Sequence, residues 1–288
     1  MDSSKGWLTA IPLEKYSSLH KLSLMGLLGW KYSWPQKYFY VQFVFNLHTP
    51  LIIDPKAYLV FHTIDEEKAS SFDECCYTIS RFKRWRIDIS SYSSFDDYIA
   101  SLIRWHRNVY AKAKRKFTEY GVQPVYIEED WTTEVQHVYD LYCNVAVKHG
   151  NRLYDLTFFE EISNRTDYKL LCCRYDGKII AMCILQVEEP TLHSICCGFD
   201  YNHSSKCYAY SWLNYEIIRM AIESHKYQEI DIGLTADEAK QAIGFNSVSS
   251  RMDIYCKGPI TRRILKVISH LLKAKISSEG KLNLSLRS

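Results

Sequence analysis

The feature that most constrains the fold is a hairpin followed by a further strand in the second half of the chain. Two strand-like runs, Tyr168–Tyr175 and Lys178–Glu188, flank Asp176-Gly177, a dipeptide typical of a two-residue hairpin turn. A third strand-like run, Leu192–Phe199, follows directly. The remaining elements as far as Phe245 are ordered around these three strands.

The junction Asp200–Cys207 is where we predict the functional site. A polar loop, Asp200–Lys206, opens a helix of about five turns that ends near His225, and Glu229–Gly233 then predicts a short strand. The start of a helix directly after a strand offers backbone N–H groups and the positive end of the helix dipole. Such a junction suits a ligand that carries phosphate.

Composition indicates an ordinary soluble globular protein. The 288 residues are 47% apolar and 24% charged, and the net charge of +3 is too small to indicate a partner. No apolar run approaches the roughly 18 residues of a membrane span, and the first residues lack an apolar signal core. We therefore expect a cytoplasmic protein.

The ten cysteines fit the same expectation. None forms a C-x-x-C motif, and Cys75-Cys76, Cys172-Cys173 and Cys196-Cys197 are adjacent pairs within strand-like runs. Neighbours on a strand point to opposite faces, so they bridge each other poorly. Reduced, buried thiols are the interpretation that follows. No spacing of His, Cys and carboxylate residues indicates a metal site.

Residues 1–90 predict a mixed α/β region. The expected elements are a helix at Leu19–Trp30 and strands at Lys37–Leu47, Tyr58–Thr63 and Cys75–Ile79. The stretch Arg81–Arg86 interleaves four cations with two aromatic residues. We interpret it as a half-exposed strand with solvated charges in preference to a nucleic-acid patch.

Phe95–Tyr120 is the clearest predicted helix. Ser94 can cap it, and Gly121 ends it in the usual position. No acidic residue lies between Asp97 and Glu119. The exposed faces carry six cations: Arg104, Arg107, Lys112, Lys114, Arg115 and Lys116. A face of one sign indicates either an anionic ligand or simple solubility, and both remain open.

After Gly121 the predicted elements follow the order β-α-α-β-β-β-α-β-α-β. The first are a strand at Val122–Glu128 and two helices, Thr133–His149 and Thr157–Asn164, each with a capping box. The last are a short helix opened by Thr235 and a strand at Arg251–Cys256. An amphipathic helix at 261–276 is expected to dock on its own domain, with membrane-surface binding as the alternative.

This order resembles the GNAT fold of acyltransferases over Val122–Cys256. Three segments resemble the branch that holds the Fem-family aminoacyltransferases and the cellulose-biosynthesis acetyltransferase-like proteins: Phe95–Gly121, Cys197-Gly-Phe-Asp200 and Asp231-Ile-Gly-Leu-Thr235 with Lys240 and Gly244-Phe245. The resemblance implies an α/β fold with a GNAT-like mixed sheet flanked by helices. It also implies three parts: a shorter, degenerate GNAT-like half at 1–90, a connecting basic helix at 91–121 and an acyltransferase domain at 122–288.

The resemblance further implies an N-acyltransferase that moves an acyl group from acyl-coenzyme A, such as acetyl-coenzyme A, to an amine on a small molecule or peptide. One alternative is a Fem-like enzyme that uses aminoacyl-tRNA, bound through the basic helix Arg104–Lys116. Another is a non-catalytic GNAT-like binding module. The loop before the long helix motivates the last alternative, because it lacks the glycines that many GNATs have there.

For the acyl carrier, the expected ligands lie in that loop: Asn202, Ser204, Ser205, Lys206, Cys207 and Tyr208. Ser204 or Ser205 acting only as a helix cap is the structural alternative. For catalysis the candidates are Lys240, Asp231 and Tyr210. The resemblance to the Fem branch implies that Lys240 stabilises the tetrahedral intermediate, and a solvated lysine is the alternative. Tyr210 is expected to act as a general acid or to pack with its hydroxyl exposed to water.

Asp231 lies between Ile230 and Ile232 on a strand, so its side chain points away from theirs and need not be buried. It is expected to hold the amine or to accept hydrogen bonds from a loop. His193 is interpreted as a strand residue and not as a base.

Overall fold

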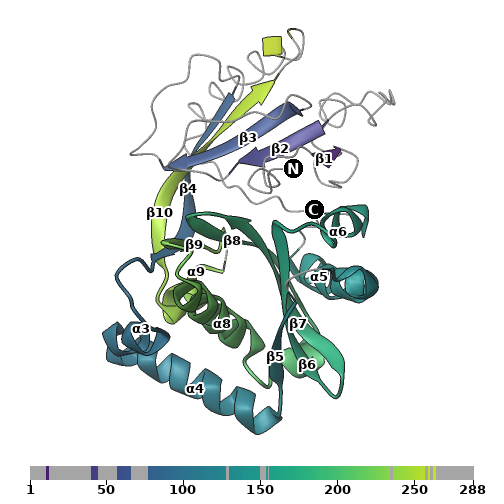
Figure 1. Cartoon of the computed structure of the whole chain (residues 1–288). Coiled ribbons are helices and arrows are strands. Elements are labelled where there is room, and N and C mark those ends of the chain that lie inside the picture. Colours follow the sequence, from purple (N-terminus) through teal and green to yellow (C-terminus); the bar gives the residue numbers. More distant parts are fainter. Residues whose placement is uncertain are drawn as a thin grey trace. The chain divides into compact units, whose positions relative to one another are not determined.

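Figure 1 shows the computed structural model on which the fold is described. The described residues are 11–12, 40–44, 57–65, 77–127, 130–149, 154, 156–233, 236–256, 259 and 262–263. The chain divides into two compact units. The smaller comprises Met1–Phe82, Gly150–Asp155 and Ser249–Ser288, and the larger comprises Lys83–His149 and Leu156–Val248.

In the smaller unit, four strands pair side by side: β1 (Ile11–Pro12), β2 (Tyr40–Val44), β3 (Ala57–Asp65) and the end of β10 (Asn246–Cys256). The β2–β3 pair is parallel, whereas β1–β2 and β3–β10 are antiparallel. The strands expected at 37–47 and 58–63 are confirmed. The helices expected at 19–30 and 261–276 lie outside the described residues, apart from positions 262 and 263.

The larger unit holds a mixed sheet in the order β4-β9-β8-β7-β6-β5. Its strands are β4 (Tyr77–Asp88), β5 (Gln123–Ile127), β6 (Tyr168–Tyr175), β7 (Lys178–Glu188), β8 (Thr191–Phe199) and β9 (Glu229–Asp231). Only the β8–β9 pair among these described strands is parallel. The predicted hairpin is confirmed, with Asp176 at φ 49 and Gly177 at φ 74, as its turn requires.

Helices cover both faces of this sheet (Figure 1). One face carries α5 (Val135–His149) and α6 (Leu156–Ile162), and the other carries α8 (Ala209–Ser224). The expected order is confirmed, with two additions: a 3-10 turn, η5 (Thr132–Glu134), before α5 and a short helix, α7 (Tyr201–Ser204), before α8. The capping box predicted at Thr133 is wrong, because Asp130 accepts the Thr132 N–H at 2.9 Å and Gln136 bonds to Asp140.

The helix predicted at Phe95–Tyr120 is two helices, α3 (Phe95–Ser101) and α4 (Arg104–Tyr120). Leu102 and Ile103 have extended backbone, with ψ of 145 and 157, so the prediction of one helix is wrong. The break leaves carbonyls at the end of α3 without helical partners, and the Arg107 guanidinium donates to those of Ala100 and Leu102. The predicted Ser94 cap and the left-handed Gly121 are both confirmed.

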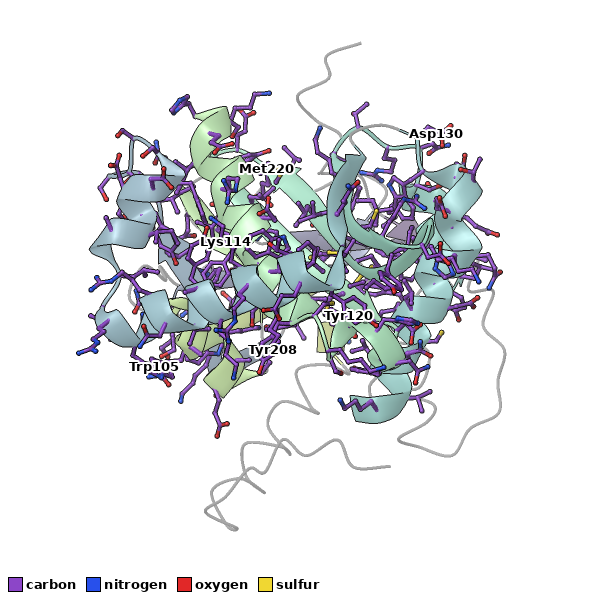
Figure 2. All side chains as sticks on the ribbon, turned by 90° about the horizontal axis from the view of Figure 1, so that it is seen from below. Trp105, Lys114, Tyr120, Asp130, Tyr208 and Met220 are labelled. Atoms are coloured by element: carbon purple, nitrogen blue, oxygen red, sulfur yellow. The ribbon has the colours of Figure 1, made fainter. Side chains whose placement is uncertain are left out.

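Helix α4 packs across α8 through aromatic rings. The Phe117 ring stacks on Trp212 with centroids 5.0 Å apart, and Tyr110 meets Tyr215 edge to face at 5.0 Å. Leu213, Ile217 and Ala221 of α8 are buried, and Met220 is half-buried. Outside this contact α4 leaves most of its cations exposed, and Figure 2 shows it crossing the molecule with Lys114 on it.

Gly198 is the point where α5 lies closest to β8. A Cβ atom on Gly198 would lie 2.6 Å from backbone atoms of Leu141 and Tyr142, a distance that real Cβ contacts do not reach. The glycine of the Gly-Phe-Asp segment is therefore required for packing of the sheet against α5.

We expect Gly198→Ala to destabilise the protein by about 1–3 kcal/mol, because the backbone of α5 must move away. Urea unfolding measures this loss. Gly121→Asn is the matched control, since Gly121 has φ 75 with no atom within 4 Å of its Cβ position and asparagine tolerates that conformation. Equal stability of Gly198→Ala and wild type would contradict the packing role.

Candidate functional site

Strands β8 and β9 part at one point. Their parallel pairing covers Thr191 to His193 against Glu229 to Asp231 and ends there, while β8 continues to Phe199. The β7–β8 register shifts at the same place, so that Ile195 is an extra residue in β8. A bulge redirects backbone groups and bends the strand. Beyond His193, β8 therefore continues without β9 as its paired neighbour.

The loop that follows β8 is more helical than predicted. Asp200 caps α7, its Oδ1 accepting the Asn202 N–H at 2.9 Å. The N-cap of α8 is Tyr208, at φ 58 and with no side-chain cap bond. The expectation that Ser204 or Ser205 caps the long helix is therefore wrong, because a separate helical turn occupies the loop.

Several backbone N–H groups of this loop are used within its own turns. Ser204 donates to the Asp200 carbonyl at 2.8 Å, and Lys206 and Cys207 donate to the His203 carbonyl at 3.0 and 3.4 Å. The groups that the loop offers to a ligand are therefore mainly side chains. Lys206 is exposed, with Asn202 and Ser205, whereas Ser204 and Cys207 are buried and Tyr208 is half-buried. Their roles as carrier ligands stay predictions.

The basic helix and this loop are neighbours. The Lys112 ammonium of α4 lies 5.0 Å from the centroid of the Tyr208 ring, a cation–π contact. The Tyr120 hydroxyl and His203 Nδ1 are 2.9 Å apart. Figure 2 shows Lys114, Tyr120 and Tyr208 on one side of the molecule. Lys112 of the basic helix thus lies beside the loop before α8.

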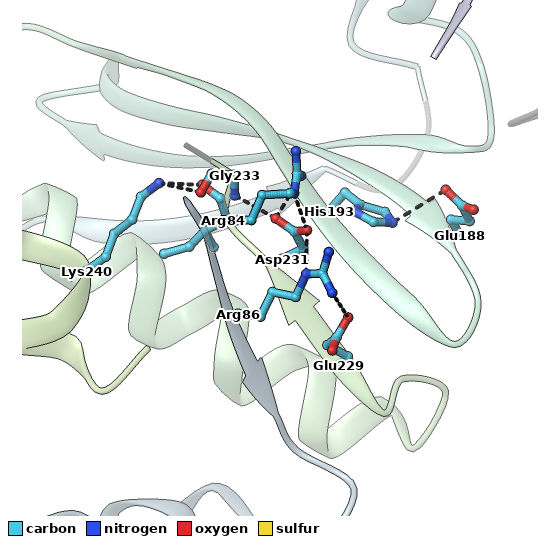
Figure 3. A network of polar contacts seen from close by, with 9 residues as sticks. Arg84, Arg86, Glu188, His193, Glu229, Asp231, Gly233 and Lys240 are labelled. Atoms are coloured by element: carbon cyan, nitrogen blue, oxygen red, sulfur yellow. Dashed lines mark hydrogen bonds and ion pairs between the residues drawn. The ribbon is translucent and has the colours of Figure 1, made fainter. Parts of the chain in front are cut away.

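Asp231 is the centre of a buried ionic cluster (Figure 3). Arg84 donates to both carboxylate oxygens, at 2.7 and 2.8 Å, and Arg86 Nε donates at 3.0 Å. The exposed fraction of Asp231 is 0%. The expectation that Asp231 need not be buried is wrong, and so is the interpretation of Arg84 and Arg86 as solvated, because β4 and β9 pair and bring these side chains together.

The charge balance keeps Asp231 ionised. Burial by itself raises the pKa of this carboxyl, but Arg84, His193 and Arg86 together hold it well below its usual range. A second buried pair continues the cluster, with His193 Nε2 3.4 Å from Glu188 Oε2. Arg84 and Arg86 are functional-site residues that the sequence reasoning missed; alternate cations on a strand were the available signal.

Lys240 is buried and points at the end of β9. It belongs to α9 (Asp237–Ile243), and its Nζ donates to the carbonyls of Ile232 at 2.7 Å and Gly233 at 3.1 Å. Burial lowers the pKa of Lys240 to about 8, although Asp231 opposes the shift. The alternative of a solvated lysine is therefore wrong, whereas a role at the oxyanion stays a prediction.

Tyr210 borders the same stretch of β8. It lies in the first turn of α8, its ring centroid is 6.0 Å from that of Phe199, and burial raises the pKa of its hydroxyl. The Cys197 thiol interacts electrostatically with both Tyr210 and Lys240. Burial raises the pKa of Cys197 to about 11, so the thiol is protonated at neutral pH. Tyr210, Lys240 and Asp231 therefore surround the point where the two strands part.

The cysteines in the described part of the chain are free thiols, as expected for Cys172, Cys173, Cys196 and Cys197. Across the described ranges, no cluster of three or more His, Cys, Asp or Glu side chains has the arrangement of a metal site. No helix within those ranges has the length and apolarity needed to span a bilayer.

The mixed sheet, whose one described parallel pair ends early, and the helix that connects the two strands of this pair match the GNAT-like fold that the sequence predicts. The chain belongs to the FemAB-like family, whose model, described as peptidoglycan biosynthesis and recognition, matches residues 56–277. This membership supports a transferase over a non-catalytic binding module.

The fold of one solved structure agrees with that of this chain. The crystal structure of FemX superposes with a TM-score of 0.56 at 11% identity, covering 81% of this chain and 85% of that chain. L-PGS from Bacillus licheniformis gives 0.48 at 13% identity, covering 73% and 72%. A GCN5-related N-acetyltransferase from Kribbella flavida gives 0.42 at 10% identity, covering 69% and 68%. A search of curated protein sequences found no match.

Proposed function

We propose that this protein transfers an acyl group from acyl-coenzyme A to an amine. The observation that carries the proposal is the end of the β8–β9 pairing after His193 and Asp231, with Lys240 and Tyr210 both near Cys197 on the stretch of β8 that continues beyond it. An extended thioester arm that adds to a strand edge can lie there, because strand edges present backbone groups for hydrogen bonding.

The reaction requires few groups from the protein. The amine nitrogen attacks the thioester carbonyl, a C–N bond forms, and the C–S bond breaks as the sulfur leaves. The Lys240 ammonium, held by two carbonyls, is the cation that we assign to the oxyanion. Tyr210, whose hydroxyl stays protonated, is the group that we assign to protonate the departing thiolate, and the proton lost by the attacking amine nitrogen restores its hydroxyl, directly or through water.

We assign binding of the carrier's phosphate groups to the cationic surface at the start of α8. The exposed side chains of Asn202, Ser205 and Lys206, together with Lys112 of α4, supply donors and positive charge there. The glycine-free loop supports binding mainly by side chains, because three of its N–H groups already donate within the loop.

Binding of acetyl-coenzyme A tests this proposal directly. At a ligand concentration one hundred times Kd, the native state gains about 2.7 kcal/mol, which raises Tm by several degrees. Release of free thiol in the presence of an amine acceptor measures turnover. Absence of both stabilisation and a co-purified carrier would remove coenzyme A as donor. Lys206→Ala should reduce this stabilisation, because it removes a cation that we assign to the carrier phosphates. Lys178→Ala, which removes an exposed lysine next to the hairpin turn, is the charge control.

Aminoacyl-tRNA is the second candidate donor, and the exposed cations of α4 favour it. Arg104, Lys114 and Arg115 are all exposed on a helix whose buried residues are Ala113 and Phe117. Nucleic acid bound through such a face releases counterions, so its affinity falls steeply with salt. The two donors therefore differ in a property that is simple to measure.

We expect the combined variant Arg104→Ala, Lys114→Ala and Arg115→Ala to weaken tRNA binding. The slope of log affinity against log salt concentration should flatten by about 0.7–0.9 for each phosphate that the variant no longer neutralises. Titration at several salt concentrations measures the slope. Binding of acetyl-coenzyme A in the same variant is the control, because none of these three side chains lies in the loop before α8. Salt-independent tRNA binding, or none, would eliminate this donor.

A peptide amine is the acceptor class that the family description, peptidoglycan biosynthesis and recognition, supports. Comparison of a short peptide carrying a free lysine side chain with a small primary amine of equal basicity separates the two acceptor classes. A higher kcat/KM for the peptide supports the assignment, and equal values contradict it.

A further inference from the structure

Trp85 of β4 makes three hydrogen bonds to the segment that carries Lys240. Its backbone N–H donates to the Gly233 carbonyl at 3.0 Å, and its carbonyl accepts the Ile232 N–H at 2.9 Å. Its indole Nε1–H donates to Asp237 Oδ1 at 2.8 Å. The exposed fraction of Trp85 is 5%. One residue of β4 thus contacts both the end of β9 and the start of α9.

The Gly233 peptide is the link between Trp85 and Lys240. The Gly233 carbonyl accepts from the Trp85 N–H and from Lys240 Nζ, while its N–H donates to Asp231 Oδ1 at 2.7 Å. Gly233 has φ 70, in the left-handed region that favours glycine. The position of this carbonyl therefore depends on both Trp85 and the buried cluster, and it sets where the Lys240 ammonium lies.

The start of α9 depends on the indole. Helix α9 has seven residues, and its N-cap, Ala236 at φ 55, makes no side-chain cap bond. Asp237 is the first residue of the helix, and Lys240 follows one turn later. Since Asp237 is otherwise an exposed side chain, its bond to a buried Trp85 anchors the whole turn.

We propose that Trp85 is a positioning residue, which fixes Lys240 at the point where the β8–β9 pairing ends, through Gly233 and Asp237. The proposal rests on the function of Lys240 proposed above. Trp85 does not contact the reacting atoms; it acts by holding the two parts of the chain that hold the ammonium.

The charged and titratable groups around Lys240 come from four elements. They are Asp231 of β9, Arg84 of β4, Cys197 of β8 and Asp237 of α9. Because this environment keeps the lysine partly neutral near pH 8, its titration midpoint reports its position. Displacement toward water moves the midpoint toward the ordinary value of 10.5.

Trp85→Phe tests the proposal, because phenylalanine keeps a buried ring and removes the Nε1–H donor. Competitive labelling of Lys240 with acetic anhydride, followed by mass spectrometry from pH 6 to 11, gives the midpoint without any need for turnover. We expect it to rise by about one pH unit, and kcat to fall by about tenfold or more with KM for the carrier within about twofold.

Two variants make the outcome specific. Asp237→Asn keeps an oxygen acceptor for the indole and should retain most of kcat, whereas Asp237→Ala should lower kcat as Trp85→Phe does, and the double variant should lower it little further. Trp212→Phe is the control for loss of an indole, since Trp212 Nε1 has no hydrogen-bond partner within the described residues.

An unchanged Lys240 midpoint in Trp85→Phe would overturn the proposal. Equal effects of Trp212→Phe would do the same. A shifted midpoint in a wild-type protein that shows no acyl transfer with any carrier would instead retain the positioning of Lys240 and reject the proposed function.

Discussion

Asp231→Asn is expected to destabilise the folded protein by about 3–5 kcal/mol, because it removes the anion from a buried cluster and leaves two cations in place. Arg84 and Arg86 are 6% and 3% exposed, so water cannot solvate either guanidinium in the folded state. Asparagine also keeps only one oxygen acceptor, whereas the carboxylate supplies two to Arg84, Arg86 and the Gly233 N–H. Urea unfolding at neutral pH measures the loss.

Asp176→Asn is the matched control for this substitution. Asp176 is exposed in the hairpin turn at φ 49, a conformation that asparagine tolerates, so its change should stay within about 0.5 kcal/mol. A loss below about 1 kcal/mol for Asp231→Asn would show that the two arginines find other compensation and would contradict the central role of the carboxylate.

The same cluster is expected to make the free energy of unfolding depend on pH in the acid range. The pKa of Asp231 lies below its unfolded value of 3.8, so its contribution is complete above that pH and is lost as pH falls toward the folded pKa. Wild type should therefore lose stability below about pH 4 more steeply than Asp231→Asn, which lacks the titrating group. Parallel acid limbs in the two proteins would contradict the assignment.

Lys240→Ala is expected to lower kcat by about 10²–10³, the usual cost of removing one donor from an oxyanion. The pH dependence identifies the active form. Because the folded pKa of Lys240 is about 8, a role as ammonium predicts that the rate falls as pH rises through about 8. A role as neutral base predicts the opposite, a rate that rises through the same value.

Lys240→Arg separates these roles further, because arginine stays charged across this range. The fall in rate near pH 8 should be absent in Lys240→Arg, even where the maximal rate of this variant is reduced. Lys226→Ala, which removes an exposed lysine after α8, is the control and should leave both rate and profile unchanged. An alkaline limb that persists in Lys240→Arg would assign the titration to another group.

Stability supplies an independent check of the Lys240 titration. The folded pKa of about 8 lies below the ordinary 10.5, so the unfolded chain binds more protons between these values. Stability should therefore increase as pH rises from about 8 to about 10.5, and this increase should be absent in Lys240→Ala.

Local signals predicted the order of elements well. The Asp176-Gly177 turn, the Ser94 cap and the Gly121 end were each readable because they depend on neighbours in sequence. The Gly-Phe-Asp and Asp-Ile-Gly segments together located the candidate site near the ends of β8 and β9. The two segments lie at the ends of β8 and β9 because a single helix, α8, connects these two strands.

The pairing of strands that lie far apart in the sequence could not be predicted from the sequence. Arg84 and Asp231 are 147 residues apart, and nothing near either residue shows that β4 lies beside β9. The burial of Lys240 has the same origin, since it depends on carbonyls at the end of β9. The break at Leu102 escaped prediction because its compensation comes from the Arg107 side chain, which periodicity does not register.

The pairing of β4 with β9 also limits how this enzyme can be shortened. Excision at Val122 would preserve every element of the GNAT-like order, yet it would strip Asp231 of both its cations and Gly233 of the Trp85 amide. The catalytic part is thus not an interchangeable module that begins where the resemblance begins. Any autonomous fragment must start upstream of Lys83, and natural variation at Arg84 and Arg86 should be coupled to variation at Asp231.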